Sequence, residues 1–207
     1  MSQHRVKIKL CGITSPDQAR QAVDLGVDAL GMILHADSPR LISRQKAQLI
    51  RAEVPAFVSL VGVVVNCPVE QLNRMAQDIG LDLVQLHGDE DANDAERLQV
   101  PYIRAIRAKS EQQIAAEMEN FPAARAILLD PWMAGVHGGT GQMLDLDLWP
   151  RESTKPLVLA GGLNADNIAS RVAAVRPFAV DLNSGVEVAP GAKDFKMVAA
   201  ALAALGR

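Results

Sequence analysis

Short apolar runs alternate along the chain with segments in which apolar residues recur at helical spacing. The runs predict strands at residues 6–11, 28–34, 57–65, 82–86, 100–106, 126–130, 156–160 and 178–182. The run at 57–65 is almost uninterrupted, which is typical of a strand covered on both faces in a parallel sheet. The helical spacing predicts helices that begin near Ser15, Ser43 and Pro68, followed by helices at 92–98, 112–119, 165–175 and 193–205.

This alternation of eight strands with helices predicts an α/β protein and fits two architectures. One is a closed (β/α)8 barrel, the TIM barrel, and the other is an open doubly wound sheet. Evenly spaced units with glycine-rich turns after the seventh and eighth strands favour the closed barrel. The links are short and show no change in composition, so residues 1–207 are predicted to form a single domain.

Each of the last two predicted strands runs directly into a turn suited to binding an anion. Gly161 and Gly162 follow the seventh strand, and Asn183, Ser184 and Gly185 follow the eighth. Glycine lets the backbone approach a ligand closely, and successive exposed N–H groups cradle a phosphate. Because (β/α)8 barrels bind phosphate after strands seven and eight, these residues predict a site for a phosphorylated small molecule.

The first predicted strand carries polar side chains on the face expected to point into the barrel. Alternation places Lys7, Lys9 and Cys11 on that face, because the opposite face is entirely apolar. A buried lysine needs a partner, and closure of the barrel would bring Asp181 of the eighth strand beside Lys9. The nearby ammonium is expected to lower the pKa of the Cys11 thiol and favour its thiolate. The alternative for Cys11 is an inert, buried cysteine.

Four further polar residues stand near strand ends, where barrel enzymes place their catalytic groups. Asp130 ends an apolar strand and would form an acid–base pair with Cys11 across the barrel mouth; its alternative is to cap the following loop. Gln85 and His87 face inward at the end of the fourth strand as candidate substrate contacts, with a purely structural histidine as the alternative. Arg40, in the loop after the second strand, suits a substrate carboxylate, unless it is an ordinary solvated arginine.

Composition and charge narrow the classes of function. Of the 207 residues, 49% are hydrophobic and only 3% aromatic, which predicts a sizeable core of Leu, Val, Ile and Ala. The net charge of −3 is spread without a basic stripe, which argues against nucleic-acid binding. No apolar stretch approaches the ~20 residues of a membrane span, and the first residues lack a signal-type core. A cytoplasmic protein that does not act at a membrane is therefore predicted.

The sequence contains no pattern for a metal or a cofactor. Cys11 and Cys67 have no closely spaced Cys or His partners, which argues against a zinc site and against a disulfide framework. The Gly-Gly-Thr-Gly segment at 138–141 lacks the spacing of a dinucleotide fingerprint and is predicted to form a flap over the site. We therefore predict a reaction that uses neither a metal nor a cofactor.

Several of these segments occur in an order that resembles a known family. They are KLCGIT at 9–14, QLHG at 85–88, LLD at 128–130, GGTG at 138–141, GGLN at 161–164, and the stretch 176–187. As an ordered set they resemble the phosphoribosylanthranilate isomerases of tryptophan biosynthesis, from about residue 6 to the C-terminus. The resemblance implies an Amadori rearrangement that converts N-(5-phosphoribosyl)anthranilate, an aminoaldose, into the aminoketose 1-(2-carboxyphenylamino)-1-deoxy-D-ribulose 5-phosphate.

The resemblance also implies roles for individual residues. Asp130 would be the general acid that protonates the furanose ring oxygen, and the Cys11 thiolate would be the general base at the sugar C2. Arg40 would meet the anthranilate carboxylate. Further substrate contacts are implied for Asp181, Gln85 and His87, and phosphate contacts for Gly161, Gly162, Ser184 and Gly185.

Some positions depart from the usual pattern of that family. Residues 31–35 lack the aromatic side chains often found on strand two, and residues 144–146 lack a Phe and a Trp around the central aspartate. Asn183 stands where a serine is more usual. These changes affect the packing expected around the anthranilate ring, whereas the proposed acid, base and phosphate turns are intact.

Two other functions stay open on the sequence alone. An aminoaldose isomerase of histidine biosynthesis shares the fold, the phosphate turns and the reaction type, but resembles a two-aspartate site, whereas the first strand here ends in Cys11. A phosphate-binding barrel without catalysis would act as a sensor or a scaffold. The sequence is compatible with a monomer and with a homodimer.

Overall fold

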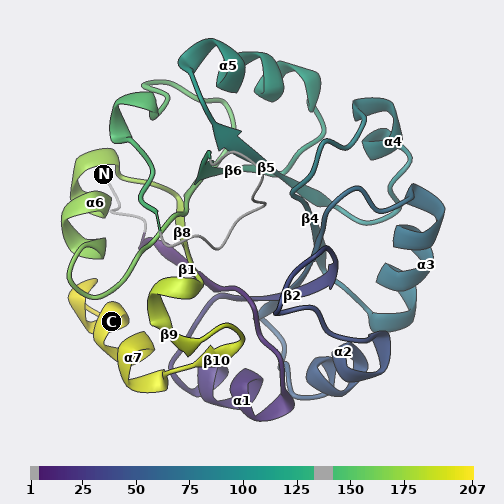
Figure 1. Cartoon of the computed structure of the whole chain (residues 1–207), viewed down its shortest axis with the longest axis vertical. Coiled ribbons are helices and arrows are strands. Elements are labelled where there is room, and N and C mark those ends of the chain that lie inside the picture. The colour runs from purple at the N-terminus through teal and green to yellow at the C-terminus, as the bar shows by residue number, and fades with distance from the viewer. Residues whose placement is uncertain (1–4, 133–141) are drawn as a thin grey trace.

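The computed structural model of the chain describes residues 5–132 and 142–207. Within them, strands β1 to β8 close into a barrel in which neighbouring strands are parallel (Figure 1). Closure joins β8 to β1, which confirms the predicted barrel and excludes the open doubly wound sheet. The strands are Lys7–Leu10 (β1), Ala29–His35 (β2), Ser59–Val64 (β3), Leu83–Leu86 (β4), Tyr102–Ala108 (β5), Ala126–Pro131 (β6), Leu157–Leu159 (β7) and Ala179–Leu182 (β8).

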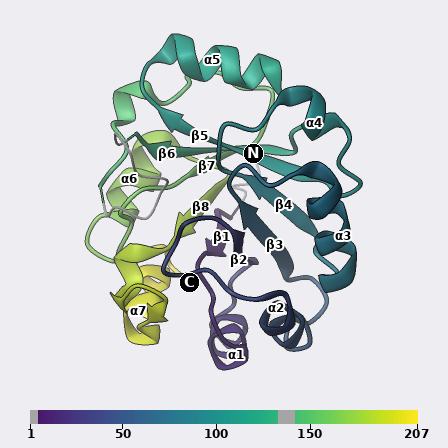
Figure 2. The same cartoon turned by 45° about the vertical axis from the view of Figure 1, so that its right-hand side comes forward.

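The α-helices form a ring outside the barrel (Figure 2). Ser15 and Ser43 begin the first two helices, and each accepts a hydrogen bond from the N–H three residues later, as an N-cap does. Between β6 and β7 the described residues contain only a short 3-10 turn, η1 (Leu146–Leu148). In the described part of the chain, no helix has the length and apolar character to cross a membrane. The helices are Pro16–Asp24 (α1), Arg44–Arg51 (α2), Val69–Ile79 (α3), Ala92–Glu96 (α4), Glu111–Asn120 (α5), Ile168–Val175 (α6) and Phe195–Ala204 (α7).

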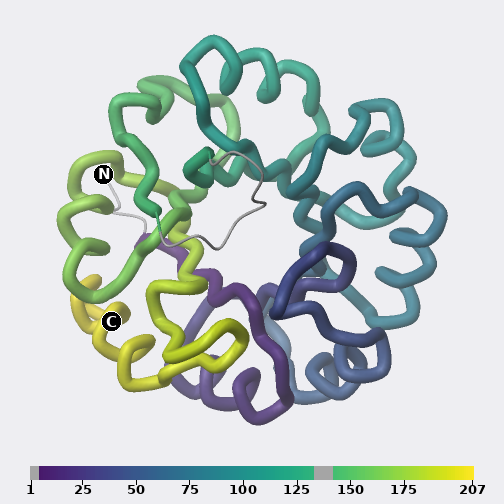
Figure 3. The backbone as a smooth tube through the Cα atoms, viewed as in Figure 1, coloured from purple at the N-terminus to yellow at the C-terminus, as the bar shows by residue number. Residues whose placement is uncertain are grey.

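A hairpin separates β8 from the last helix. After η2 (Ser184–Val186), the chain forms the antiparallel strands β9 (Glu187–Ala189) and β10 (Ala192–Lys193). Figure 3 shows this yellow hairpin beside the purple N-terminal part of the chain. The Gln18 side-chain amide at the start of α1 donates a 2.8 Å hydrogen bond to the carbonyl of Gly191 in the hairpin turn. The hairpin is therefore fixed next to the loop that follows β1.

Two hydrophobic layers surround and fill the barrel. The larger layer lies between strands and helices and includes Ile8 and Leu10 of β1, which are fully buried. The alternation along β1 therefore sends Lys9 to the barrel side, as predicted. A smaller layer lines the inside of the barrel, and its buried members are Ile103, Ala105, Ala126, Leu128, Val158, Ala160 and Ala179.

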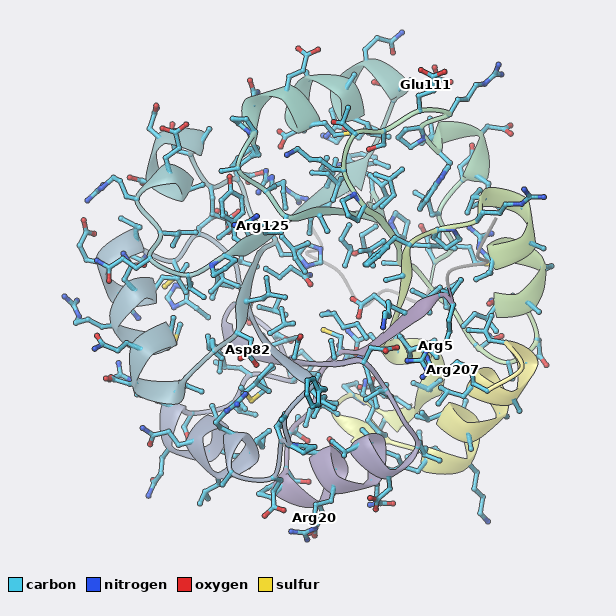
Figure 4. All side chains as sticks on the ribbon, turned by 180° about the vertical axis from the view of Figure 1, so that it is seen from behind. Arg5, Arg20, Asp82, Glu111, Arg125 and Arg207 are labelled. Carbon is cyan, nitrogen blue, oxygen red and sulfur yellow. The ribbon has the colours of Figure 1, made fainter. Side chains whose placement is uncertain are left out.

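At the opposite end of the barrel from the strand C-termini, Asp28 gathers several donors. Its carboxylate accepts hydrogen bonds from Arg5 at 2.6 Å, Lys7 at 3.2 Å, Arg207 at 2.9 Å and the backbone N–H of Ile8 at 2.9 Å. Seen from behind, Arg5 and Arg207 lie side by side (Figure 4). Burial raises the pKa of Asp28, but the hydrogen bonds from Ile8, Arg207 and Lys7 and the Arg207 charge lower it more, so it lies below its ordinary value. Lys7, predicted to face the barrel interior, is half exposed at this end.

Two element boundaries differ from the prediction in ways that matter below. Phe57, assigned to the third strand by its apolar run, is fully exposed with a φ of +72°, and β3 begins at Ser59. Lys193, expected to begin the last helix, belongs instead to β10. Asp194 caps α7 by accepting hydrogen bonds from two N–H groups of the first turn.

Candidate active site

A cavity opens at the C-terminal ends of the barrel strands, where the sequence predicted the chemistry to lie. About 730 Å³ of empty space, open solvent included, lies in the cavity and its mouth. Gly185 does not line the cavity. The predicted site residues that do line it are Cys11, Arg40, Gln85, His87, Asp130, Gly161, Gly162, Asp181, Asn183 and Ser184.

Lys9 and Asp181 form an ion pair inside the barrel. The register of β1 and β8 places them directly opposite each other, and Lys9 Nζ lies 2.9 Å from Asp181 Oδ1. The two side chains are only 5% and 8% exposed, so the pair predicted from alternation and closure is confirmed. Burial lowers the pKa of Lys9, but Asp181 and Cys11 raise it more, which stabilises the ammonium. Burial also raises the pKa of Asp181, and Lys9 offsets only part of that effect.

The electrostatics of Cys11 differ from the prediction. Its side chain is buried at the end of β1 and lines the cavity. Burial raises the pKa of the Cys11 thiol above its ordinary value, and the charges of Lys9 and Lys193 lower it only in part. The predicted fall in pKa is therefore wrong in sign, because loss of hydration disfavours the thiolate more than the nearby ammonium groups favour it.

Asp130 lies at the end of β6, opposite the side chains of Gln85 and His87 from the end of β4. His87 Nε2 is 3.4 Å from Asp130 Oδ2, and Gln85 Nε2 is 3.0 Å from His87 Nδ1. With the Gln85 amide donating, His87 Nδ1 accepts and Nε2 carries the ring proton, but Nε2 makes no hydrogen bond to the residues that the structure describes. The sequence predicted all three residues at the site, but not this chain of contacts between them.

Arg40 is held by a carboxylate that the sequence reasoning missed. Its Nε lies 3.0 and 3.1 Å from the two carboxylate oxygens of Glu187, and its Nη2 lies 2.7 Å from Oε2. The two side chains are 8% and 3% exposed, so the alternative of a solvated loop arginine is wrong. Burial raises the pKa of Glu187, but hydrogen bonds from Arg40 and Lys193 lower it more, so it lies below its ordinary value.

Lys193 completes this cluster from the hairpin. Its Nζ donates to Glu187 Oε1 at 2.7 Å, to Asn183 Oδ1 at 2.9 Å and to the Asn183 carbonyl at 3.1 Å. The Lys193 side chain is fully buried, and burial lowers its pKa below the ordinary value. A group of four residues therefore joins the loop after β2 to the turn after β8. We call it the Glu187 cluster, and its members are Arg40, Glu187, Lys193 and Asn183.

The two predicted phosphate turns pack against each other. Gly161 and Gly162 follow β7 with φ values of +91° and +57°, a region that L side chains rarely adopt. In the other turn, a Cβ atom at Gly185 would lie 2.2 Å from the carbonyl oxygen of Leu163. Glycine at 185 therefore allows the β8 turn to reach the β7 turn, which places Ser184 in the wall of the cavity.

The segment 138–141, predicted to form a flap, lies outside the described residues. Gln142, where the described chain resumes, lines the cavity beside Pro131. Among the described residues, no group of three or more His, Cys, Asp and Glu side chains is arranged to hold a metal ion.

Comparisons with known proteins give the family. The family model for N-(5'-phosphoribosyl)anthranilate isomerase matches residues 8–204. The N-(5'-phosphoribosyl)anthranilate isomerase of a Pseudomonas fluorescens strain is 45% identical over 202 residues, which cover 98% of this chain and 96% of that protein. The chain belongs to this isomerase family. A Pseudomonas paraeruginosa member is likewise 45% identical over 195 residues, 94% of this chain and 92% of its own length.

Solved structures of the isomerase family have the same fold. The phosphoribosyl anthranilate isomerase from Thermotoga maritima superposes with a TM-score of 0.89 at 35% identity, covering 97% of this chain and 98% of its own. Another isomerase structure, in complex with reduced 1-(o-carboxyphenylamino)-1-deoxyribulose 5-phosphate, gives 0.85 at 34% identity with the same coverage. The predicted resemblance, TIM-barrel fold and class of isomerase of tryptophan biosynthesis are confirmed. A further structure shows monomers derived from the dimeric Thermotoga isomerase; for this chain, monomer or homodimer stays a prediction.

Glu187 and Lys193 are the members of this isomerase site that the sequence reasoning did not find. Both lie just beyond the β8 turn, and they flank the Pro190-Gly191 turn of the hairpin. Two opposite charges on either side of such a turn are a signal for a paired hairpin. That signal was hidden because Lys193 also fits the start of the helix that follows.

Proposed function

We propose that the chain converts N-(5'-phosphoribosyl)anthranilate into 1-(2-carboxyphenylamino)-1-deoxy-D-ribulose 5-phosphate, with Asp130 as general acid and Cys11 as general base. The observation that carries the proposal is the shared cavity: the sulfur, the carboxyl group and both glycine turns line one space at the strand ends.

We further propose that residues 1–207 act as a single domain, since the Lys9–Asp181 pair closes the barrel between its first and last strands.

The first step needs a proton donor. Asp130 donates its proton to the furanose ring oxygen while the bond from C1 to that oxygen breaks. The lone pair of the anthranilate nitrogen forms the C1=N bond, so the product is a cationic Schiff base with a free hydroxyl on the opened sugar. His87 lies beside the carboxyl group that must supply this proton, with its Nε2 3.4 Å from Asp130 Oδ2. Proton transfer from a positioned acid typically gives a ~10²–10⁴-fold acceleration.

The second step needs a proton acceptor at C2. The Cys11 thiolate removes the C2 proton, and the electrons of the C–H bond form a C1=C2 double bond while the Schiff-base nitrogen recovers its lone pair. The resulting enolamine loses its hydroxyl proton and gains a proton at C1, which gives the ketone. Burial raises the pKa of Cys11, so the thiolate depends on the neighbouring Lys9 ammonium and on the cationic Schiff base formed in the first step.

Binding follows from the remaining cavity residues. The phosphate is placed at the paired turns after β7 and β8, on backbone N–H groups of Gly161, Gly162, Ser184 and Gly185 and on Asn183. The tight approach of Gly185 to Leu163 and the positive φ of Gly161 and Gly162 support this assignment. Arg40 binds the anthranilate carboxylate, and the other polar contacts to the sugar come from Gln85, His87 and Asp181.

The test is turnover of freshly prepared N-(5'-phosphoribosyl)anthranilate, followed by the loss of its anthranilate fluorescence. Cys11→Ala and Asp130→Asn should each lower kcat by at least about 100-fold. Cys67→Ala is the matched control, since this second buried cysteine does not line the cavity and should leave kcat unchanged. Titration with the reduced product analogue should show that both active-site variants still bind it.

Wild-type turnover in Cys11→Ala or in Asp130→Asn would remove that residue from the mechanism. A wild-type protein that binds the analogue without turning over the substrate would instead indicate a phosphate-binding barrel without catalysis.

A further inference from the structure

Glu187 and Lys193 lie behind residues of the cavity wall and take no part in the proposed proton transfers. Their side chains are 3% and 0% exposed, and both are charged. Such deeply buried charges are rare unless they are paired. Their contacts lead to Arg40 and Asn183, which line the cavity, whereas Glu187 and Lys193 do not. The cluster therefore supports two cavity residues from behind.

Glu187 fixes Arg40 by one edge of its guanidinium. The carboxylate takes the Nε–H at 3.0 and 3.1 Å and one N–H of Nη2 at 2.7 Å. A guanidinium has five N–H donors in a rigid plane. The end-on edge, made of Nη1 and the second N–H of Nη2, has no partner among the residues that the structure describes. This edge has the geometry that accepts a second carboxylate through two parallel hydrogen bonds.

The Glu187 cluster carries a net positive charge, which also favours a carboxylate on the ligand. Arg40 and Lys193 contribute two positive charges, and Glu187 supplies one negative charge. The excess of one positive charge lies in a part of the molecule where water is largely excluded, so it favours an anionic group of the ligand. A single carboxylate would neutralise it.

We propose that Glu187 is a positioning residue that holds the end-on edge of Arg40 toward the ligand and thereby makes the cavity selective for a carboxylate on the aromatic ring. Lys193 supports this role by holding Glu187 Oε1 and the β8 turn together. The inference rests on the proposed function, which places the anthranilate carboxylate at Arg40. Glu187 itself does not touch the ligand and acts through Arg40.

The experiment measures how much affinity depends on the ligand carboxylate. The dissociation constants of two probes are compared by titration calorimetry: the reduced product analogue and the same molecule with a phenyl ring in place of the carboxyphenyl ring. In the wild type, removing the carboxylate should weaken binding about 10- to 100-fold. We express this effect as the ratio of the two dissociation constants, that of the phenyl probe divided by that of the carboxyphenyl probe. In Arg40→Met this ratio should fall to about one. In Glu187→Gln the ratio should also fall most of the way to one. A neutral amide has a single acceptor oxygen and no charge, so it cannot accept both hydrogen bonds from the Arg40 guanidinium as the carboxylate does.

The ratio separates positioning from a merely structural role. A variant that only loosens the fold would weaken both probes equally and keep the wild-type ratio. Glu117→Gln is the control, because Glu117 also accepts hydrogen bonds from Nε and Nη2 of an arginine, Arg104, at 3.1 and 2.9 Å, here through Oε2 alone, and neither residue lines the cavity. Its ratio should equal that of the wild type.

A wild-type ratio in folded Glu187→Gln would overturn the inference. If this variant does not fold, Glu187→Asp carries the test: it keeps the charge but is one methylene too short for the fork, and a wild-type ratio in it would have the same meaning. A ratio near one in the wild-type protein would refute the placement of the carboxylate at Arg40. Failure of the wild type to turn over the substrate would refute the proposed function instead, whatever the ratios.

Discussion

Replacing Lys9 with methionine would leave the Asp181 carboxylate buried inside the barrel without its ammonium partner. The two groups are 2.9 Å apart, and their side chains are 5% and 8% exposed. Removing one partner of such a buried pair costs about 3–5 kcal/mol, because the remaining charge is neither hydrated nor paired. For a domain of this size each kcal/mol lowers Tm by ~2–4 °C, so Lys9→Met should melt roughly 6–20 °C below the wild type.

The matched double variant is Lys9→Met with Asp181→Leu. It removes both charges and leaves apolar side chains of similar volume, a replacement that is often neutral or even stabilising. We expect it to recover most of the stability lost in either single variant. The free energies of unfolding of the four proteins come from urea titration at pH 7, followed by circular dichroism. Additive losses in the double variant would refute the idea that the pair is energetically coupled.

The pH dependence of this contribution has a defined sign. Asp181 and Cys11 raise the pKa of Lys9 in the folded protein above its ordinary value of 10.5. The stabilisation from Lys9 is therefore fully present below that value and is lost only as the pH rises through the higher folded-state pKa. On the alkaline side, the difference in stability between wild type and Lys9→Met should shrink only in strong alkali. On the acid side, it should shrink as the buried Asp181 carboxyl of the variant, whose pKa burial raises, takes up a proton and loses its unpaired charge.

Three further predictions concern other parts of the structure. Because burial raises the pKa of Cys11, the rate at which iodoacetamide alkylates this thiol should still be rising at the ordinary thiol value of 9.0, and a plateau reached below that pH would contradict it. Gly185→Ala should weaken binding of the reduced product analogue by at least ~10-fold, because its methyl group would lie 2.2 Å from the Leu163 carbonyl; Gly206→Ala, with nothing within 4 Å, should not, and equal affinities would refute the reasoning. Asp28, with a lowered pKa, stabilises the protein above its unfolded value near 3.8 and loses this effect as the pH falls through the lower folded value. Asp28→Asn should accordingly be less stable than the wild type at neutral pH and converge with it near pH ~2 in acid unfolding, and a constant gap would contradict this.

The features that the sequence predicted best are those set by periodicity. Alternation along β1 separates Lys9 and Cys11 from the apolar face, and closure of an eight-stranded barrel makes β8 the neighbour of β1. Together they predict the contact between Lys9 and Asp181, although the residues are 172 positions apart. The glycine turns follow the seventh and eighth strands, as predicted, because glycine-rich residues directly after an apolar run mark the end of a strand in the sequence itself.

The features that the sequence did not predict depend on irregular backbone or on a balance of opposing effects. The fork between Arg40 and Glu187 joins two loops 147 positions apart, through a hairpin that has no periodic signal. The pKa of Cys11 depends on how far burial outweighs Lys9, and burial depth is a property of the folded chain. Phe57 belongs to an apolar run but is exposed to water, because such a run does not by itself show at which residue the strand begins.

The long separations in the Lys9–Asp181 pair have a consequence during protein synthesis. A ribosome adding about 5–20 residues per second needs roughly 9–34 s to progress from Lys9 to Asp181. Throughout that interval the nascent polypeptide carries Lys9 of β1 and Arg40 of the loop after β2 without the carboxylates that pair with them. Asp181, which pairs with Lys9 in the closed barrel, and Glu187, which holds Arg40, are both synthesised near the end of translation. Barrel closure and the ability to catalyse the reaction should therefore arise together.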